Sequence, residues 1–324
     1  TGGSVESSPA IVNGVVYVGS FDDKVYALNA TNGGSIWSYT TGGSVESSAA
    51  VASGVVYISQ YNRVYALDAA TGTQIWTYTA VPSVQSSPTV TNGLVYIGVT
   101  NKVNALNAST GASVWTSYIS NYQSSPAVAD GKVYVGSLDG NVYCLNASNG
   151  AYIWSYTTGN WIESSPAVVD GVLYVGSDDG KVYALNATNG ASIWNYTTGS
   201  YVKSSPAVAG GIVYVGSFDN KVYALDAATG TQIWNATTGG YVESSPAVAN
   251  GIVYVGSDDN KTYCLDAATG AYVWTYTTGS AVRSSPAVVD GKVYVGSNDQ
   301  KIYCLNAATG AHIWNYTTGH WVWS

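Results

Sequence analysis

The sequence repeats itself at an interval of about forty residues, which limits the chain to folds built from copies of one unit. A Ser-Ser-Pro signature, with one Ser-Ser-Ala variant, marks each copy. Its first serine is at Ser7, Ser47, Ser86, Ser124, Ser164, Ser204, Ser244 and Ser284. One tryptophan per copy keeps the same interval, at Trp37, Trp76, Trp115, Trp154, Trp194, Trp234, Trp274 and Trp314. The two markers agree on eight copies.

Each copy has the pattern of four short strands. In residues 164–200, runs rich in Val, Tyr and Ile are separated by Asp170-Gly171 and by turn residues at 178–181 and 187–190. Asp-Gly and Asn-Gly pairs between such runs predict type I′ hairpins. Blades of four antiparallel strands bury both faces of each sheet when they pack radially. The sequence therefore predicts an all-β, eight-bladed β-propeller, whereas a stacked solenoid would need polar end caps that the copies lack.

We expect a single domain over residues 1–324, with approximate blades at 1–41, 42–80, 81–118, 119–158, 159–198, 199–238, 239–278 and 279–317. Residues 318–324 align with residues 1–7 and so begin a ninth copy. Trp321 and Trp323 lie in this overhang, where leaving two large aromatic side chains in water is unfavourable. We expect them to close the ring or to contact another molecule.

The composition excludes several functions. Only 9% of the residues are charged, the net charge is −8, and the eleven basic residues are scattered along the copies. Binding to nucleic acid needs clustered Lys and Arg, so we expect none. No apolar run approaches the roughly 20 residues of a membrane helix, so we expect no membrane insertion. The three cysteines are an odd number, which argues against a full disulfide framework.

A longer motif recurs in every copy: Ala-x-Asn/Asp-x-x-Thr/Asn-Gly-x-x-x-Trp, as in Ala184, Asn186, Asn189, Gly190 and Trp194. In three copies the Ala is replaced, by Cys144, Cys264 and Cys304, so these cysteines are expected to be small buried side chains. The motif resembles the tryptophan-docking motif of the pyrroloquinoline-quinone-type (PQQ-like) propeller repeat family, over essentially the whole chain. The resemblance implies that each Trp packs on the Ala and the Thr-Gly peptide of neighbouring blades. That family includes quinone-dependent alcohol dehydrogenases, a bacterial outer-membrane-assembly lipoprotein and archaeal surface proteins, and the chain is closest in character to its cell-surface repeat proteins.

Catalysis is not expected. Quinone-dependent members of that family use an adjacent Cys-Cys pair, a Trp floor and a Ca²⁺ site on extended loops, and this chain has neither a Cys-Cys pair nor an inserted loop. The only histidines are His312 and His320, and His312 is at a strand position that varies freely between copies. The Asp22-Asp23 and Asp178-Asp179 pairs lie in turns, with Lys24 and Lys181 as local counter-charge. We therefore expect no catalytic residue, no metal and no cofactor.

The copies differ most at two positions. The residue before Ser-Ser is expected to ring one mouth of the channel, where its mixed charges either pair with one another or bind a polar ligand: Glu6, Glu46, Gln85, Gln123, Glu163, Lys203, Glu243 and Arg283. Two residues earlier, consecutive copies carry Trp161, Tyr201 and Tyr241. These aromatic residues indicate either a contact surface for protein or sugar, or packing between linkers.

Several Asn-x-Ser/Thr sequons favour an extracellular or cell-surface location. Asn195, Asn235 and Asn315 fall on the expected outermost strands and are the glycosylation candidates, whereas four others coincide with a motif position that caps its own turn. The leading expectation is a non-catalytic extracellular scaffold or interaction propeller, such as a surface-layer, filament or adhesin-like component with protein or glycan partners. The alternative is a carbohydrate- or peptide-binding propeller that uses the channel mouth and aromatic face. A quinone-dependent dehydrogenase is the third.

Overall fold

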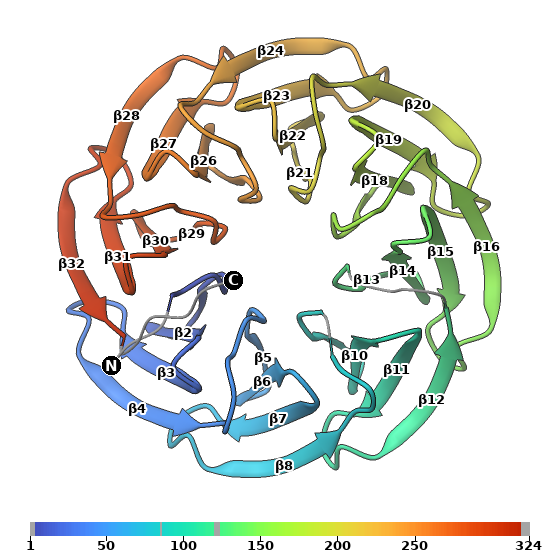
Figure 1. Cartoon of the computed structure of the whole chain (residues 1–324), viewed down its shortest axis with the longest axis vertical. Helices are drawn as coiled ribbons and strands as arrows, with labels where there is room; N and C mark the ends of the chain where they lie inside the picture. Colours follow the sequence, from blue (N-terminus) through green and yellow to red (C-terminus); the bar gives the residue numbers. More distant parts are fainter. Residues whose placement is uncertain (1–3, 85, 120–123, 319–324) are drawn as a thin grey trace.

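A computed structural model describes residues 4–84, 86–119 and 124–318. In these residues the chain forms thirty-two strands, arranged as eight four-stranded antiparallel sheets around a ring (Figure 1). The predicted eight-bladed β-propeller is thereby confirmed. No helix in the described ranges could cross a membrane. The expectations for Gln85, Gln123, His320, Trp321 and Trp323 concern positions outside the described residues.

The strands follow one another blade by blade. The first four blades contain β1 (Ala10–Val12), β2 (Val15–Ser20), β3 (Lys24–Asn29), β4 (Ser35–Thr40); β5 (Ala50–Ala52), β6 (Val55–Gln60), β7 (Arg63–Asp68), β8 (Gln74–Thr79); β9 (Thr89–Thr91), β10 (Leu94–Val99), β11 (Lys102–Asn107), β12 (Ser113–Tyr118); β13 (Ala127–Ala129), β14 (Lys132–Gly136), β15 (Asn141–Asn146), β16 (Tyr152–Thr157). The last four contain β17 (Ala167–Val169), β18 (Val172–Ser177), β19 (Lys181–Asn186), β20 (Ser192–Thr197); β21 (Ala207–Ala209), β22 (Ile212–Ser217), β23 (Lys221–Asp226), β24 (Gln232–Thr237); β25 (Ala247–Ala249), β26 (Ile252–Ser257), β27 (Lys261–Asp266), β28 (Tyr272–Thr277); β29 (Ala287–Val289), β30 (Lys292–Ser297), β31 (Lys301–Asn306), β32 (His312–Thr317).

Each blade runs from a three-residue strand at the channel to a six-residue strand on the outer wall (Figure 1). The first hairpin of each blade turns through two residues of positive φ, as in Asp170 (50°) and Gly171 (75°). This is the type I′ geometry that the Asp-Gly and Asn-Gly pairs predict. The second strands are almost wholly buried because the sheets on both sides cover them.

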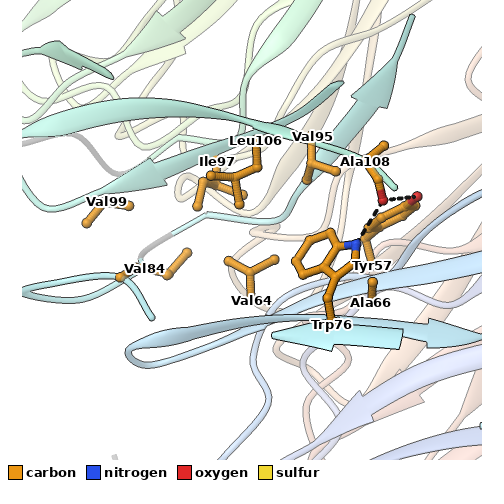
Figure 2. Packing of buried hydrophobic residues seen from close by; sticks show 11 residues of the cluster. Tyr57, Val64, Ala66, Trp76, Val84, Val95, Ile97, Val99, Leu106 and Ala108 are labelled. Atoms are coloured by element: carbon orange, nitrogen blue, oxygen red, sulfur yellow. Dashed lines mark hydrogen bonds between the residues drawn. The ribbon is translucent and has the colours of Figure 1, made fainter. Parts of the chain in front are cut away.

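The hydrophobic core consists of layers between neighbouring blades. One layer joins Tyr57, Val64 and Trp76 of the second blade to Val95, Ile97 and Leu106 of the third (Figure 2). A layer of the same kind lies between each pair of neighbours, including the last and first blades. Each sheet therefore contributes apolar side chains to two layers, and no blade has a core of its own.

The indole of each repeat tryptophan joins two blades. Trp194 is paired with Ala184 on the neighbouring strand of its own blade, and its ring lies against Gly230 of the next blade. Its Nε1–H donates to the Ala227 carbonyl at 2.9 Å. The hydroxyl of Tyr174 donates to that same carbonyl at 3.1 Å, a partner that the sequence motif does not include. The arrangement recurs at all eight blade junctions.

A ring of serines lines the inner ends of the blades. The first serine of each Ser-Ser pair bonds within its own blade, as when Ser204 Oγ accepts the Gly216 N–H at 3.0 Å. The second serine links blades, because its backbone N–H donates to the hydroxyl oxygen of the matching serine one blade further on. These eight bonds, of 2.9–3.0 Å, connect Ser8, Ser48, Ser87, Ser125, Ser165, Ser205, Ser245 and Ser285 in a circle.

The ring closes through these same repeated contacts. Ser285 N–H donates to Ser8 Oγ at 3.0 Å, and Trp314 Nε1–H donates to the Ala30 carbonyl at 3.2 Å. The eighth blade takes all four of its strands from residues 287–317. Closure within the described residues therefore needs no strand exchanged between the two ends of the chain.

The glycine under each indole gives a test of blade docking. A Cβ at Gly230 would lie 2.6 Å from Trp194, whereas one at Gly251, with almost the same positive φ (75° against 71°), would meet nothing within 4 Å. Gly251→Ala therefore incurs only backbone strain of about 1–2 kcal/mol. Gly230→Ala should lower the free energy of unfolding by about 1–3 kcal/mol more than that control, because it also overpacks the indole. Urea denaturation measures both, and equal losses would contradict this role of the indole contact.

The cysteines give a second test. Cys144, Cys264 and Cys304 are free and fully buried, each paired across the sheet with its blade's tryptophan. Burial raises the thiol pKa to about 12 for Cys144 and Cys264 and to about 11 for Cys304. We expect a thiol reagent at pH 8 to leave the native protein unlabelled and to modify three thiols after denaturation, counted by mass spectrometry. Rapid labelling of the native protein would contradict this burial.

Candidate functional site at the channel mouth

One face of the ring carries the two variable positions that the sequence singles out as candidate site positions. This linker face is formed by the segments that join successive blades and by the turns between the second and third strands of each blade. Backbone bonds hold the two together: Val202 N–H donates to the Ser177 carbonyl and Phe218 N–H donates to the Tyr201 carbonyl. The described residues just before the Ser-Ser pairs are thereby placed beside the serine ring, at the channel mouth.

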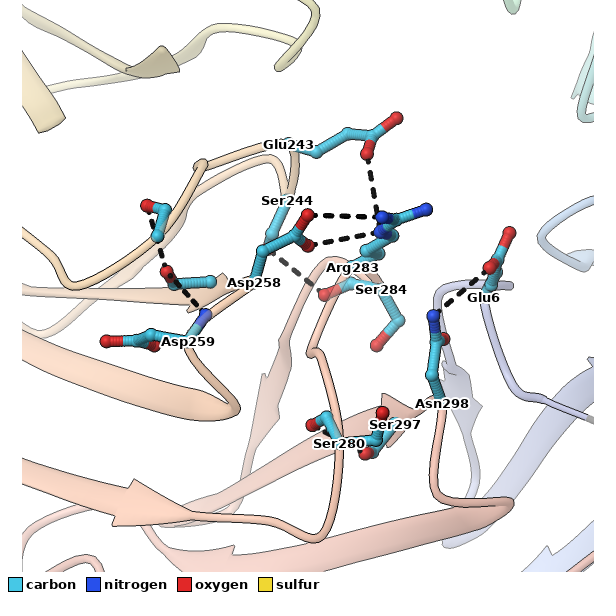
Figure 3. Close-up of polar contacts among 12 residues, drawn as sticks. Glu6, Glu243, Ser244, Asp258, Asp259, Ser280, Arg283, Ser284, Ser297 and Asn298 are labelled. Carbon is cyan, nitrogen blue, oxygen red and sulfur yellow. Dashed lines mark hydrogen bonds and ion pairs between the residues drawn. The ribbon is translucent and has the colours of Figure 1, made fainter. Parts of the chain in front are cut away.

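Arg283 forms ion pairs with two carboxylates at the channel mouth, between the seventh and eighth blades. Its guanidinium donates from Nε and Nη2 to the two carboxylate oxygens of Asp258, both at 3.1 Å, and Nε lies 3.6 Å from Glu243 (Figure 3). Next to this group, the Asn298 amide donates to Glu6 at 3.3 Å. The expected pairing of mixed charges thus occurs here, although Asp258 and Asn298 come from turns rather than from the predicted position.

Lys203 forms ion pairs with two carboxylates at the channel mouth, between the fifth and sixth blades. Its Nζ lies 2.9 Å from Glu163 Oε1 and 3.9 Å from Asp178 Oδ2. The Asp178 side chain is only 6% exposed, and its Oδ1 has no hydrogen-bond partner among the described residues. Burial raises the Asp178 pKa to about 6, with a further rise from Glu163 and Asp179 that Lys203 opposes. This carboxyl is therefore poorly compensated when it ionises.

The mouth remains acidic after this pairing. Its described members are six carboxylates and two cations: Glu6, Glu46, Glu163, Asp178, Glu243 and Asp258, against Lys203 and Arg283. Desolvation raises the pKa of Glu46, and the charge of Glu6 raises it further. No basic side chain in the described part of the chain forms an ion pair with Glu46. The two cations lie with the later blades, and the charge of Arg283 also reaches Glu6, so the uncompensated negative charge is that of Glu46 in the second blade.

An aromatic patch, made of Tyr201, Phe218 and Tyr241, lies beside Lys203. The Phe218 ring stacks on the Tyr241 ring, with centroids 4.9 Å apart and planes inclined by 7°. The Phe218 ring also contacts the Tyr201 ring, and these two centroids are 6.3 Å apart. Lys203 Nζ is 5.5 Å from the Phe218 centroid. Tyr201 and Tyr241 remain 49% and 51% exposed. Trp161 is equally exposed, but it makes no ring contact with the patch.

Phe218, which lies at the centre of the patch, is not among the site residues predicted from the sequence. A signal was available, because the chain has only two phenylalanines, Phe21 and Phe218, and both occupy the turn position that is Asp178 or Asp258 in the blades next to Phe218. A side chain at this position contacts the linkers on both sides, as Phe218 contacts Tyr201 and Tyr241.

A pocket of about 690 Å³ opens on the linker face between the second and third blades. This mouth pocket is lined by seven serines and by Glu46, Gln60, Tyr61 and Val84 among others. Of these residues, only Glu46 was predicted as a site residue from the sequence. A second pocket, of about 430 Å³, lies between the same blades at the turns that include Ser53, Asn92 and Ser109.

The two residues of the Asp178-Asp179 pair have different roles, and Asp179 is the structural one. Asp179 accepts hydrogen bonds from the Tyr183 hydroxyl, the Lys181 backbone N–H and the Gly159 N–H. Asp178 is approached by Lys203, not by the sequence neighbour Lys181 that we expected to supply the counter-charge. The described residues contain no group of three side chains suited to hold a metal ion. The cysteines lie in separate blades, so these residues do not fit a quinone with its Ca²⁺.

The sequons divide as expected from the sequence. Asn186 Oδ1 accepts the N–H groups of Thr188 and Asn189, and Asn29, Asn107 and Asn146 cap their own turns in the same way. Asn195, Asn235 and Asn315 are exposed on β20, β24 and β32. These three side chains lie on the outer wall, away from the channel.

Asp178 makes stability depend on pH. A carboxyl whose folded pKa exceeds its unfolded value stabilises the fold when protonated, and that contribution is lost as pH rises from about 4 through about 6. Asp178→Asn should therefore stabilise the protein by about 1–3 kcal/mol at pH 7.5 and have little effect at pH 4. Urea denaturation of variant and wild type at both pH values measures the difference. A variant whose advantage does not grow with pH would contradict the strained ionised state.

Comparison with known proteins places the chain in a family. No curated protein sequence matches it significantly. Among solved structures, BamB from Moraxella catarrhalis has a TM-score of 0.78 at 19% identity, covering 95% of this chain and 96% of that one. The computationally designed Ika8 protein has a TM-score of 0.84 at 17% identity, covering 94% and 96%. A quinohemoprotein alcohol dehydrogenase from Pseudomonas putida HK5 has a TM-score of 0.76 at 18% identity, covering 96% and 70%.

These structural likenesses, all below 20% identity, show the fold alone. A family model described as outer membrane protein assembly factor BamB matches residues 1–98, 22–118, 99–240 and 219–320 in overlapping stretches. Because these matches cover nearly the whole length, the chain belongs to the BamB-like family of PQQ-type propeller repeats.

Proposed function

We propose that this chain is a non-catalytic interaction propeller of the cell envelope or cell exterior, and that its linker face binds a protein partner. The observation that carries the proposal is the aromatic patch. Its stacked rings are held in place, yet Tyr201 and Tyr241 are each about half exposed. Aromatic residues with polar tips are enriched at the centres of protein interfaces.

The surroundings of the patch support a protein partner. Lys203, Glu163 and Asp178 form a charged group at its edge, and Lys203 contacts Phe218 directly. A rigid aromatic centre with a polar rim is the usual anatomy of an interface. Tyr side chains also lose little conformational freedom on binding, and this patch is already ordered by stacking. A surface-layer, filament or adhesin-like scaffold would use such a contact to join neighbouring molecules.

A non-catalytic role agrees with the chemistry of the described side chains. The three thiols are buried with raised pKa values, and His312 is exposed on the outer strand β32. Four turn carboxylates each accept structural hydrogen bonds from a tyrosine hydroxyl and a backbone N–H, namely Asp179, Asp219, Asp259 and Asp299. None of these groups is paired as a nucleophile with its base.

An envelope or extracellular location is supported by two observations. The family model is described as a factor of outer membrane protein assembly. In addition, Asn195, Asn235 and Asn315 are exposed on the outer wall, where attached glycans would leave the linker face open. We therefore propose these three as the glycosylation sites. The glycan-binding alternative fits a different part of the linker face, the mouth pocket.

The patch can be tested with peptides selected from a displayed library on the wild-type protein. The double variant Tyr201→Ala/Tyr241→Ala should weaken the selected peptides by at least about 30-fold, because central aromatic anchors contribute about 2 kcal/mol or more. The matched control is Tyr152→Ala/Tyr272→Ala, which removes two equally exposed tyrosines from the outer strands β16 and β28. It should change the affinity less than about twofold, since those residues lie outside the patch.

Selected peptides that bind both double variants equally would count against the patch.

The non-catalytic assignment has its own check. Quinone added with Ca²⁺ should change neither the melting temperature nor the absorbance of the quinone. A saturable shift in either would contradict the assignment.

A further inference from the structure

The mouth pocket exists because the second blade departs from the repeat. In six other blades a glycine near the end of the second strand lets the Val or Ile of the next linker approach, and a Cβ there would lie 2.3–2.5 Å from that residue. The second blade has Ser59 at this position. Val84, its linker residue, is accordingly 9% exposed and lines the pocket, whereas Val45, Val202 and Val242 are fully buried.

Gln60 is the second departure. Its place is taken by serine in most blades, where the hydroxyl bonds to linker carbonyls, as Ser217 does with Ser200 and Tyr201. The Gln60 side chain is 8% exposed and lines the pocket, and its carboxamide has no hydrogen-bond partner among the described residues. Because Gln60 lines the pocket, its carboxamide can both donate hydrogen bonds to a ligand there and accept them from it.

The remaining lining supplies both polar and apolar contacts. The hydroxyl oxygens of Ser87 and Ser125 each accept a backbone N–H in the serine ring, so their protons remain free to donate. The Glu46 carboxylate accepts hydrogen bonds. Tyr61 presents a ring that is 71% exposed at the turn between β6 and β7.

This lining selects a class of ligand. Among the described residues that line the pocket there is no Lys or Arg, and Glu46 is acidic, which disfavours phosphates and carboxylates. The many hydroxyls disfavour a purely apolar ligand. The volume of about 690 Å³ lies within the usual range for small-molecule sites. A polyhydroxylated ring with one apolar face satisfies the donors, the acceptors and the exposed aromatic ring together.

We propose that the mouth pocket binds a saccharide of one or two neutral rings. Tyr61 stacks on a sugar face, and Gln60, Glu46 and the ring serines hydrogen-bond to its hydroxyls. This site is separate from the aromatic patch, so it does not depend on the protein partner proposed there.

Titration calorimetry of the whole chain with glucose, galactose, N-acetylglucosamine, maltose and cellobiose tests the site. We expect at least one of these sugars to bind saturably, with a Kd of about 0.1–10 mM. Tyr61→Ala should weaken that sugar by about tenfold through loss of stacking. Tyr152→Ala, which removes an exposed tyrosine from β16, is the control and should leave the Kd within about twofold, because it lies outside the pocket.

A second variant, Gly43→Ala, displaces the Gln60 side chain without substituting Gln60 itself. A Cβ at Gly43 would lie 2.0 Å from Gln60 Nε2, the end of a flexible side chain that can move aside. Gly43→Ala should therefore fold normally, as circular dichroism and the melting temperature would show. It should weaken the sugar by about fivefold or more, since the displaced carboxamide loses its hydrogen bonds to the ligand.

Three outcomes would overturn the proposal. One is the absence of saturable binding by all five sugars. Another is sugar binding that survives both Tyr61→Ala and Gly43→Ala, because the sugar would then occupy a different site. The third is that Nα-acetyl-lysine amide, which keeps the positive charge of its side chain, binds while the sugars do not, and that Glu46→Gln abolishes this binding. That result would show that the pocket binds a cationic side chain.

Discussion

The contact between an indole and the next blade is the interaction on which the rest of this structure depends. It combines a flat apolar surface, a glycine that cannot carry a side chain there, and a carbonyl that accepts from both a tryptophan and a tyrosine. Because an isolated blade has no core, each sheet is stable only where such contacts attach it to two neighbours. The last junction, at Trp314 and Ala30, uses the same contact as the others and so closes the ring.

This dependence determines where the copies can differ. The second strands, the third strands and the motif turn all take part in junctions, and the serine pairs link the inner ends of the blades. Substitution there would weaken two blades at once. Linker positions such as 201 and 241 lie on the surface of the junctions, so aromatic or charged side chains at these positions leave the docking contacts unchanged. Individual features therefore accumulate on the linker face.

The sequence was sufficient for the repeated architecture and insufficient for the site. Asp170-Gly171 predicts its turn, and Trp194 with Gly190 indicates its motif, because these signals are local and recur along the chain, in six copies for the Asp-Gly or Asn-Gly pair and in all eight for the tryptophan motif. The partners of Arg283 and Lys203 could not be predicted in the same way. Asp258 and Asp178 reach the mouth from turns that are adjacent only in space. Gln60 and Ser59 each occur once at their position, and Phe218 shares its position only with Phe21 of the first blade, so repetition did not reveal their role.

The mouth pocket shows how such a chain acquires a cavity without an inserted loop. Replacing a glycine with Ser59 adds a side chain where the repeat requires none, and the linker residue Val84 can no longer pack fully. Gln60 then lies in the pocket beside Gly43. In other blades the residue at this position is a serine that hydrogen-bonds to a linker carbonyl, as Ser217 does with Ser200. The Ser59 hydroxyl also donates to the Ser86 carbonyl at 2.6 Å, which links the second and third blades beside the pocket. Since Trp76 still docks on Gly111 and donates to Ala108, the ring tolerates the incomplete packing of Val84 and gains a concave polar surface at the channel mouth.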